Sequence, residues 1–170
     1  MKLHLGGQQP RRDWTIVDII PGPYVDEVCD VKNLNFCQDF SVEHIYASHV
    51  LEHFSFQEEV PLVLREWFRV LKPHGKLWIS VPDMLKIGKM LLESQDTAEH
   101  VDLMRMLFGG QIDSYDLHKI GFDRLILTGY LHTTGFVHIE ETTGFNLFDD
   151  CSSMLFKDKP ISLNMTCEKP

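Results

Sequence analysis

The fold is decided by two neighbouring stretches, residues 43–54 (EHIYASHVLEHF) and residues 63–83 (VLREWFRVLKPHGKLWISVPD). Each stretch joins a short apolar run to a turn or a helix. Apolar runs bounded by turns are typical of strands that are buried on both faces, as in a parallel sheet. We therefore predict strands at residues 44–47 and 76–81, with one helix between them.

The helix between these strands has one apolar face, which consists of Val60, Val63, Leu64, Trp67, Val70 and Leu71. Pro73 and Gly75 end the helix. Its start is predicted only within residues 55–59, because two signals conflict. Ser55 and Glu58 have the spacing of a capping box, whereas Pro61 would then remove a hydrogen bond just past the first turn.

The rest of the chain alternates in the same way. We expect further strands at residues 2–5, 14–20, 25–31, 136–141 and 161–167. Residues 84–108 have a helical pattern that breaks near residues 94–97, and residues 109–121 are a polar loop. Asp123 is placed to cap a helix that runs to Thr134, with Gly135 as its stop. We expect one α/β domain over residues 1–170, with a helical insertion at about residues 84–134.

Composition excludes several classes of protein. The chain has 170 residues and a net charge of -9, and no basic stripe of the kind that a general nucleic-acid binder needs. No apolar run is long enough to span a membrane, and no signal-peptide pattern is present. The four cysteines form no CxxC pair. We expect a cytoplasmic protein with reduced thiols, acting on a small or uncharged molecule.

The order of these elements resembles the class I S-adenosylmethionine (SAM) dependent methyltransferases. The segments GGQIDSYDLHKIGF and ISLNMTCEKP also look like the short predicted enzymes of the methyltransferase type 11 kind. The resemblance implies a Rossmann-like three-layer sandwich: a mostly parallel seven-stranded sheet with helices on both faces and an antiparallel last strand. It also implies SAM as cofactor and methyl transfer as activity.

The resemblance assigns cofactor roles to residues that follow the first three strands. Gly6 and Gly7, which lack Cβ atoms, allow a tight turn and would hold the methionine end of SAM. Asp18 would accept hydrogen bonds from the ribose hydroxyls, although it follows Gly6 sooner than the usual spacing of about 20 residues. Asp30 would accept from the adenine amino group, with the backbone of Val31 beside it. Plain turn roles for these residues remain open.

The fourth strand is followed by a second group of candidates. Ser48 and His49 come at the carboxyl edge of the sheet, where ligands bind in open α/β sheets, and His53 lies one helical turn further on. His49 is a candidate for contact with SAM and for general-base catalysis. Packing beneath the loop is the alternative for one of the two histidines.

The loop after the inserted helices is where this family often builds its acceptor pocket. Gln111, Tyr115 and Asp116 are therefore candidates for substrate binding, and His118 is a second candidate base. The sequence does not name the methyl acceptor, and a sugar, a lipid intermediate or a small metabolite would all suit it.

The first turn departs from the family pattern. Only Gln8–Asp13 separate Gly7 from Trp14, so a full helix does not fit between the first two strands. A degenerate fold that only binds a partner is therefore an alternative to an enzyme. A second subunit, in a homodimer or a complex with another chain, would help to close the pocket. A nicotinamide-dependent oxidoreductase would need a G-x-G-x-x-G motif, which is absent.

A five-residue segment also matches a zinc-hydrolase motif, H-x-x-E-H, at His49, Glu52 and His53. That chemistry requires a long helix through the motif and a third ligand. Because a strand pattern runs up to Ala47, the flanking residues favour the methyltransferase interpretation, and we expect no metal site.

Overall fold

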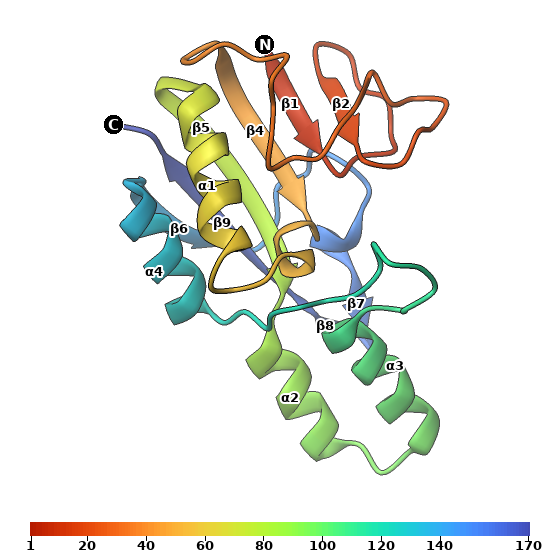
Figure 1. The fold of residues 1–170 in the computed structure, drawn as a ribbon. Helices are drawn as coiled ribbons and strands as arrows, with labels where there is room; N and C mark the ends of the chain where they lie inside the picture. Colours follow the sequence, from red (N-terminus) through yellow and green to blue (C-terminus); the bar gives the residue numbers. More distant parts are fainter.

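A seven-stranded sheet with the order β3-β2-β1-β4-β5-β9-β6 organises the computed structural model, which describes residues 1–170 (Figure 1). The strands are β1 Lys2–Leu5, β2 Thr15–Asp18, β3 Glu27–Val28, β4 Val42–Ser48, β5 Leu71–Pro82, β6 Val137–Thr142 and β9 Ser162–Glu168. β9 lies antiparallel between β5 and β6, and the pairs from β3 to β5 are parallel. The predicted α/β fold, with its antiparallel last strand, is confirmed.

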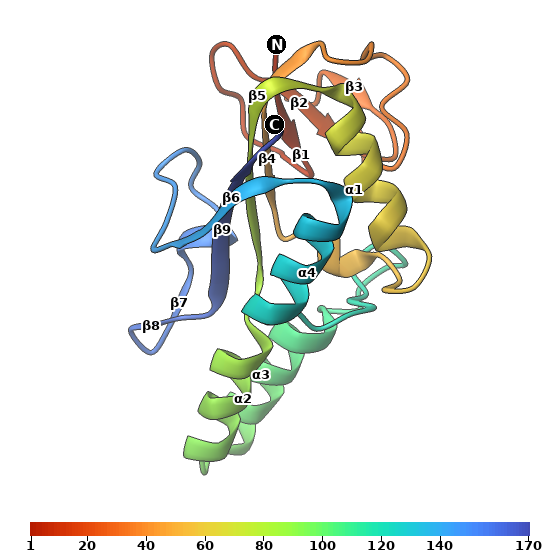
Figure 2. The same ribbon diagram turned by 90° about the vertical axis from the view of Figure 1, so that its left-hand side faces the viewer.

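Four α-helices accompany the sheet: α1 Glu59–Val70, α2 Met84–Glu93, α3 Thr97–Phe108 and α4 Arg124–Thr134. α1 and α4 cover one face of the sheet, whereas α2 and α3 form a hairpin that projects beyond its end (Figures 1 and 2). The insertion predicted over residues 84–134 therefore has two parts. Only α2 and α3 leave the body of the fold, because α4 packs beside α1.

We expected a second layer of helices on the other face of the sheet, but no α-helix lies on that face. The connection between β6 and β9 covers it, and no helix separates β1 from β2 (Figure 2). Aromatic side chains fill this layer: Phe148 packs against His4 at 3.9 Å and against Tyr46 at 5.0 Å between ring centroids. The Tyr46 hydroxyl donates to Asp150 at 2.7 Å, so the buried phenol keeps a partner. A short hairpin, β7 Leu155–Phe156 and β8 Lys159–Pro160, was not predicted.

The helix ends follow from local chemistry. At α1, Ser55 N–H donates to Glu59 at 2.9 Å and Glu59 N–H donates to the Ser55 hydroxyl at 3.4 Å. The capping partner is thus Glu59 rather than the predicted Glu58, and Pro61 falls in the first turn, where no hydrogen bond is lost. Asp123 caps α4 by accepting from Ile126 N–H at 2.8 Å, as predicted.

The predicted apolar face of α1 is the centre of the core. Val60, Val63, Leu64, Trp67 and Val70 are fully buried against the sheet. The predicted strand at residues 25–31 shrinks to two exposed residues, Glu27–Val28, at the sheet edge. β5 is longer than predicted, because it begins at Leu71, directly after α1.

Candidate functional site

A cavity of about 430 Å³ opens at the carboxyl ends of β1, β2 and β4. Its lining includes most of the residues that the sequence predicted to bind the cofactor, namely Gly6, Asp18, Asp30, Val31, His49 and His53. These residues come from four separate segments, and the parallel strands bring them to one edge of the sheet. We call this space the cofactor cavity.

Gly6 has a left-handed backbone, with φ of 68°, and its N–H donates to Val17 O at 2.8 Å. A Cβ atom at this position would lie 2.3 Å from Cγ2 of Val50, so only glycine fits. A Cβ at Gly7 would lie 2.5 Å from the His4 ring. Gly7 stands outside the cavity lining, so its smallness serves the packing of His4.

Asp18 is almost buried, and one carboxylate oxygen accepts from Ile20 N–H at 2.7 Å. Its other oxygen has no protein hydrogen bond and remains available to a hydroxyl of a ligand. Asp30 accepts from Lys32 N–H at 2.9 Å, and the Lys32 ammonium lies 3.4 Å from the same carboxylate. Both carboxylates therefore stabilise the turns that follow them while also lining the cavity.

A charged rim that the sequence did not predict borders this cavity. Glu59 accepts from Lys32 at 2.8 Å and from Lys119 at 3.0 Å. The hydrogen bond from Lys32, followed by those from Ser55 and Lys119, lowers the pKa of Glu59 to about 2. Because the three charged residues come from distant segments, no local pattern could have identified this rim.

Ser48 lies on the opposite side of β4 from the cofactor cavity. Its hydroxyl donates to Asp150 at 3.0 Å, beside the hydroxyl of Tyr46. Residues two apart on a strand share a face, so Ser48 follows Tyr46 toward the loop between β6 and β9. Ser48 does not line the cofactor cavity.

His49 stands where β4 ends, with a left-handed φ of 55°. Its Nε2 lies 2.8 Å from the Ser162 hydroxyl, which itself donates to Cys151 O at 2.7 Å. Because the Ser162 hydroxyl donates its proton to Cys151 O, it can only accept from His49, so we assign the proton of His49 to Nε2. Burial lowers the pKa of His49 to about 3, so the ring is neutral at pH 7.

A second cavity, of about 670 Å³, lies on the other side of His49 and His53. Its lining includes the polar residues Asp102, Arg105, Asp116 and His118 and the apolar residues Met106, Met154, Phe156 and Ile161. We call it the acceptor cavity. Two of the four predicted acceptor-side residues, Asp116 and His118, thus lie in it.

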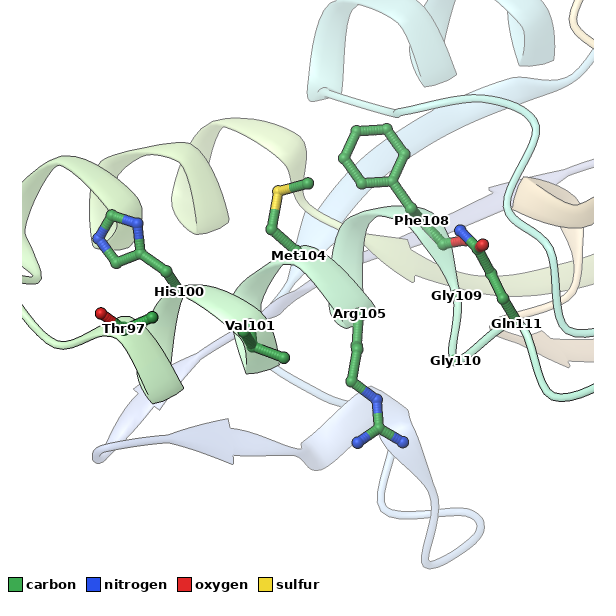
Figure 3. Close-up of a pocket in the computed structure, with 9 residues that line it drawn as sticks. All are labelled: Thr97, His100, Val101, Met104, Arg105, Phe108, Gly109, Gly110 and Gln111. Carbon is green, nitrogen blue, oxygen red and sulfur yellow. The ribbon is translucent and has the colours of Figure 1, made fainter.

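The other two predicted acceptor-side residues lie elsewhere. Tyr115 lines the cofactor cavity. Gln111 lies at the end of a hollow along α3, near Phe108 and Arg105, with Arg105 directed to the opposite side from Phe108 (Figure 3). Gln111 and Tyr115 therefore line two different cavities.

The zinc-hydrolase motif does not adopt the geometry that its chemistry requires. Only Leu51–His53 form a helix, a single 3₁₀ turn, and His49 precedes it with a left-handed backbone. His49 and His53 therefore do not share a helical face, and that interpretation of the motif was wrong. His53 instead meets His118, with ring centroids 4.9 Å apart.

The sheet order is that of the class I SAM-dependent methyltransferase fold. Residues 18–79 match the family model described as a methyltransferase domain. No curated protein sequence matches the chain.

Solved structures of SAM-dependent methyltransferases share this fold. A SAM-dependent methyltransferase from Archaeoglobus fulgidus has a TM-score of 0.66 at 15% identity, over 99% of this chain and 85% of that one. The 1,6-didemethyltoxoflavin-N1-methyltransferase of Burkholderia thailandensis, solved with bound 1,6-didemethyltoxoflavin and S-adenosylhomocysteine, has a TM-score of 0.60 at 16% identity, over 99% of this chain and 70% of that one.

A third structure of similar fold contains a partner chain. The complex of the Trm112 methyltransferase activator with a putative methyltransferase from Haloferax volcanii has a TM-score of 0.57 at 14% identity, over 99% of this chain and 82% of the matched one. In the present chain, none of the helices is both long and apolar enough for a membrane span.

Proposed function

We propose that the chain transfers the methyl group of SAM to a hydroxyl or amine of a small polar molecule, a glycan or a lipid-linked intermediate. The observation that carries the proposal is the shared wall: His49 and His53 line both the cofactor cavity and the acceptor cavity. A donor in one cavity and an acceptor in the other would meet across this wall. In-line displacement at the methyl carbon depends mainly on holding the two in near-attack geometry.

Within the cofactor cavity, the free oxygen of Asp18 is the group that would take a ribose hydroxyl. Asp30 and the backbone of Val31 would face the adenine, and the turn at Gly6 would face the methionine end. These roles combine the family resemblance with the position of each residue in the lining.

His118 is the better of the two candidate bases. Its Nδ1 lies 3.2 Å from Leu107 O, so that nitrogen carries the proton and Nε2 keeps a lone pair. Burial lowers the pKa of His118, which keeps the ring neutral at pH 7. His49 is less suited, because its Nε2 proton is engaged by Ser162 and its Nδ1 faces Glu52 at 3.4 Å.

The acceptor cavity suggests the chemical class of the acceptor. Arg105, Asp102 and Asp116 supply hydrogen bonds and charge of both signs, while the apolar residues opposite them suit a sugar ring or a short alkyl segment. The cavity volume of about 670 Å³ is within the range of small-molecule sites.

A second protein chain, either another copy or an activator subunit, is part of the same proposal. Ile19 and Ile20 line the cofactor cavity while remaining 37% and 43% exposed, and no helix after β1 covers them. Light scattering of the active fraction tests this point. A fully active monomer would contradict it.

Calorimetric titration with SAM and S-adenosylhomocysteine tests the proposed function first. We expect binding by the native chain and a large loss for Asp18→Asn, which retains an acceptor for Ile20 but alters the free oxygen. Asp123→Asn is the matched control, because asparagine also caps a helix and α4 lies away from the cavity. Absence of binding by the native chain, or equal affinity of Asp18→Asn, would overturn the assignment.

A further inference from the structure

Glu52, His53 and His118 form a cluster of potential metal ligands in the wall of the acceptor cavity. One ligand atom from each residue lies within 4.8 Å of the other two. The polar loop is held against the 3₁₀ turn by a hydrogen bond from Lys119 N–H to Glu52 O at 2.7 Å, and this contact brings His118 beside His53. The cluster is therefore built by the fold and does not follow the zinc-hydrolase spacing.

Both histidines are oriented as metal ligands usually are. His53 Nδ1 lies 3.2 Å from Leu117 O, and His118 Nδ1 lies 3.2 Å from Leu107 O. Each Nδ1 therefore carries the proton and donates it to a carbonyl, which leaves each Nε2 with an unshared lone pair. A ligating histidine typically donates its other ring N–H to a carbonyl or carboxylate in this way.

Glu52 is the second, independent sign of a ligand. The side chain is 1% exposed, yet neither carboxylate oxygen has a hydrogen-bond partner in the protein. Nδ1 of His49 lies 3.4 Å from Oε1. A buried carboxyl group without partners costs folding free energy, and a cation would offset that cost.

We propose that Glu52, His53 and His118 bind one divalent cation of the zinc class. Two imidazoles and a carboxylate suit zinc, which binds at about 2.0–2.2 Å and accepts four ligands. Ligand atoms in such a tetrahedron lie about 3.4 Å apart, so the three side chains would close by roughly 1 Å. The fourth position faces the acceptor cavity, because His53 and His118 both line it.

The site itself does not rest on the proposed methyl transfer, but it would change how an acceptor is handled. A cation takes the lone pair of His118, so this residue cannot remove a proton in the metal-loaded chain. An acceptor oxygen at the open position would instead be coordinated to the cation, which lowers the pKa of its hydroxyl group. The cation would thus select acceptors with an oxygen donor.

The experiment uses the untagged full-length chain, stripped of metal with a chelator and then dialysed against Zn²⁺ or Co²⁺. Metal content is measured by elemental analysis, and the Co²⁺ absorption spectrum reports the coordination geometry. His53→Ala and His118→Ala remove one ligand each and lie on partly exposed segments. His132→Ala is the matched control, because this residue lies at the end of α4, outside both cavities.

We expect one cation per chain, affinity lower by at least about tenfold in His53→Ala and His118→Ala, and no change in His132→Ala. Thermal unfolding of each variant shows whether it is folded. Substoichiometric metal in the native chain, or full retention by both ligand variants, would overturn the site. SAM titration of the metal-free chain is read separately, so failure of the metal site and failure of the cofactor assignment are distinguishable.

Discussion

His49 Nε2 lies 2.8 Å from the hydroxyl of Ser162, a contact that joins the end of β4 to the start of β9 across 113 positions of sequence. This bond fixes the imidazole in the wall between the two cavities. Because β9 is the strand inserted between β5 and β6, the antiparallel topology places Ser162 where it can hold His49.

Loss of the Ser162 hydroxyl should slow methyl transfer more than it weakens SAM binding. Ser162→Ala leaves the Nε2 proton of His49 without an acceptor, which allows the ring to turn. We expect turnover to fall by about fivefold, the equivalent of one ordinary hydrogen bond. Kinetics with a labelled methyl donor measure turnover, and calorimetry measures SAM affinity. Ser153→Ala is the control, because its exposed hydroxyl bonds only to Asp150 O. An equal change in both quantities would contradict a positioning role.

Gly6→Ala should destabilise the fold and abolish cofactor binding. The substitution forces a Cβ into a left-handed residue, at a cost of roughly 1–2 kcal/mol, and also against Val50. Gly129→Ala is the matched change, because a Cβ added to this helical glycine would meet no atom within 4 Å and alanine favours the helix by up to about 1 kcal/mol. The free energy of unfolding, measured with denaturant, should therefore fall in Gly6→Ala and rise in Gly129→Ala. A stable Gly6→Ala protein with normal SAM affinity would argue against the turn as a cofactor contact.

Glu59→Gln should lower stability at neutral pH but not in acid. The pKa of Glu59 is depressed to about 2, from an ordinary value near 4.5. The carboxylate therefore contributes stability above pH 4.5, and that contribution is lost as the pH falls toward 2. Because the group is partly exposed, we expect about 1 kcal/mol at pH 7.

Unfolding of Glu59→Gln and the native chain at several pH values measures this difference. Glu58→Gln serves as the control, since Glu58 is exposed and makes no hydrogen bond through its side chain. The two unfolding free energies for Glu59→Gln and native protein should converge in acid, and a constant difference at all pH values would exclude the ionic explanation.

Lys169→Met, at the second-last residue of the sequence, should lower the stability of the fold. The ammonium group, on a residue that is 5% exposed, donates to Phe68 O at 2.6 Å and Leu71 O at 2.8 Å. These carbonyls lie at the end of α1, where they have no partner within the helix. Loss of the hydrogen bonds to these carbonyls should lower the free energy of unfolding by about 1–3 kcal/mol. Thermal unfolding checks the value against Lys76→Met, whose side chain is on the surface. Equal melting temperatures for the two variants would show that the cap is not needed.

Much of the fold could be predicted from local patterns. The strand at residues 2–5 and the break between α2 and α3 were found where short-range signals act. The helix from Arg124 to Thr134 was found because Asp123 and Gly135 mark its ends. The edge strand β3 and the hairpin of β7 and β8 were not well predicted, because short exposed strands lack a buried pattern.

The candidate site was only partly predictable. Gly6, Asp18 and Asp30 come together as strand-end residues of a parallel sheet should. Ser48 turns to the other face, because strand alternation pairs it with Tyr46. Their proposed contacts with SAM stay predictions until binding is measured.

Neighbouring residues alone established the α/β class, the strand ends that carry glycine and aspartate, and the resemblance to methyltransferases, because each of these depends on short-range patterns. Tertiary packing was needed to bring His53 against His118 around Glu52 and to place Ser162 beside His49. These contacts join segments far apart in sequence. Their geometry is set by the order of the strands and by the packing of the polar loop, which no local pattern encodes.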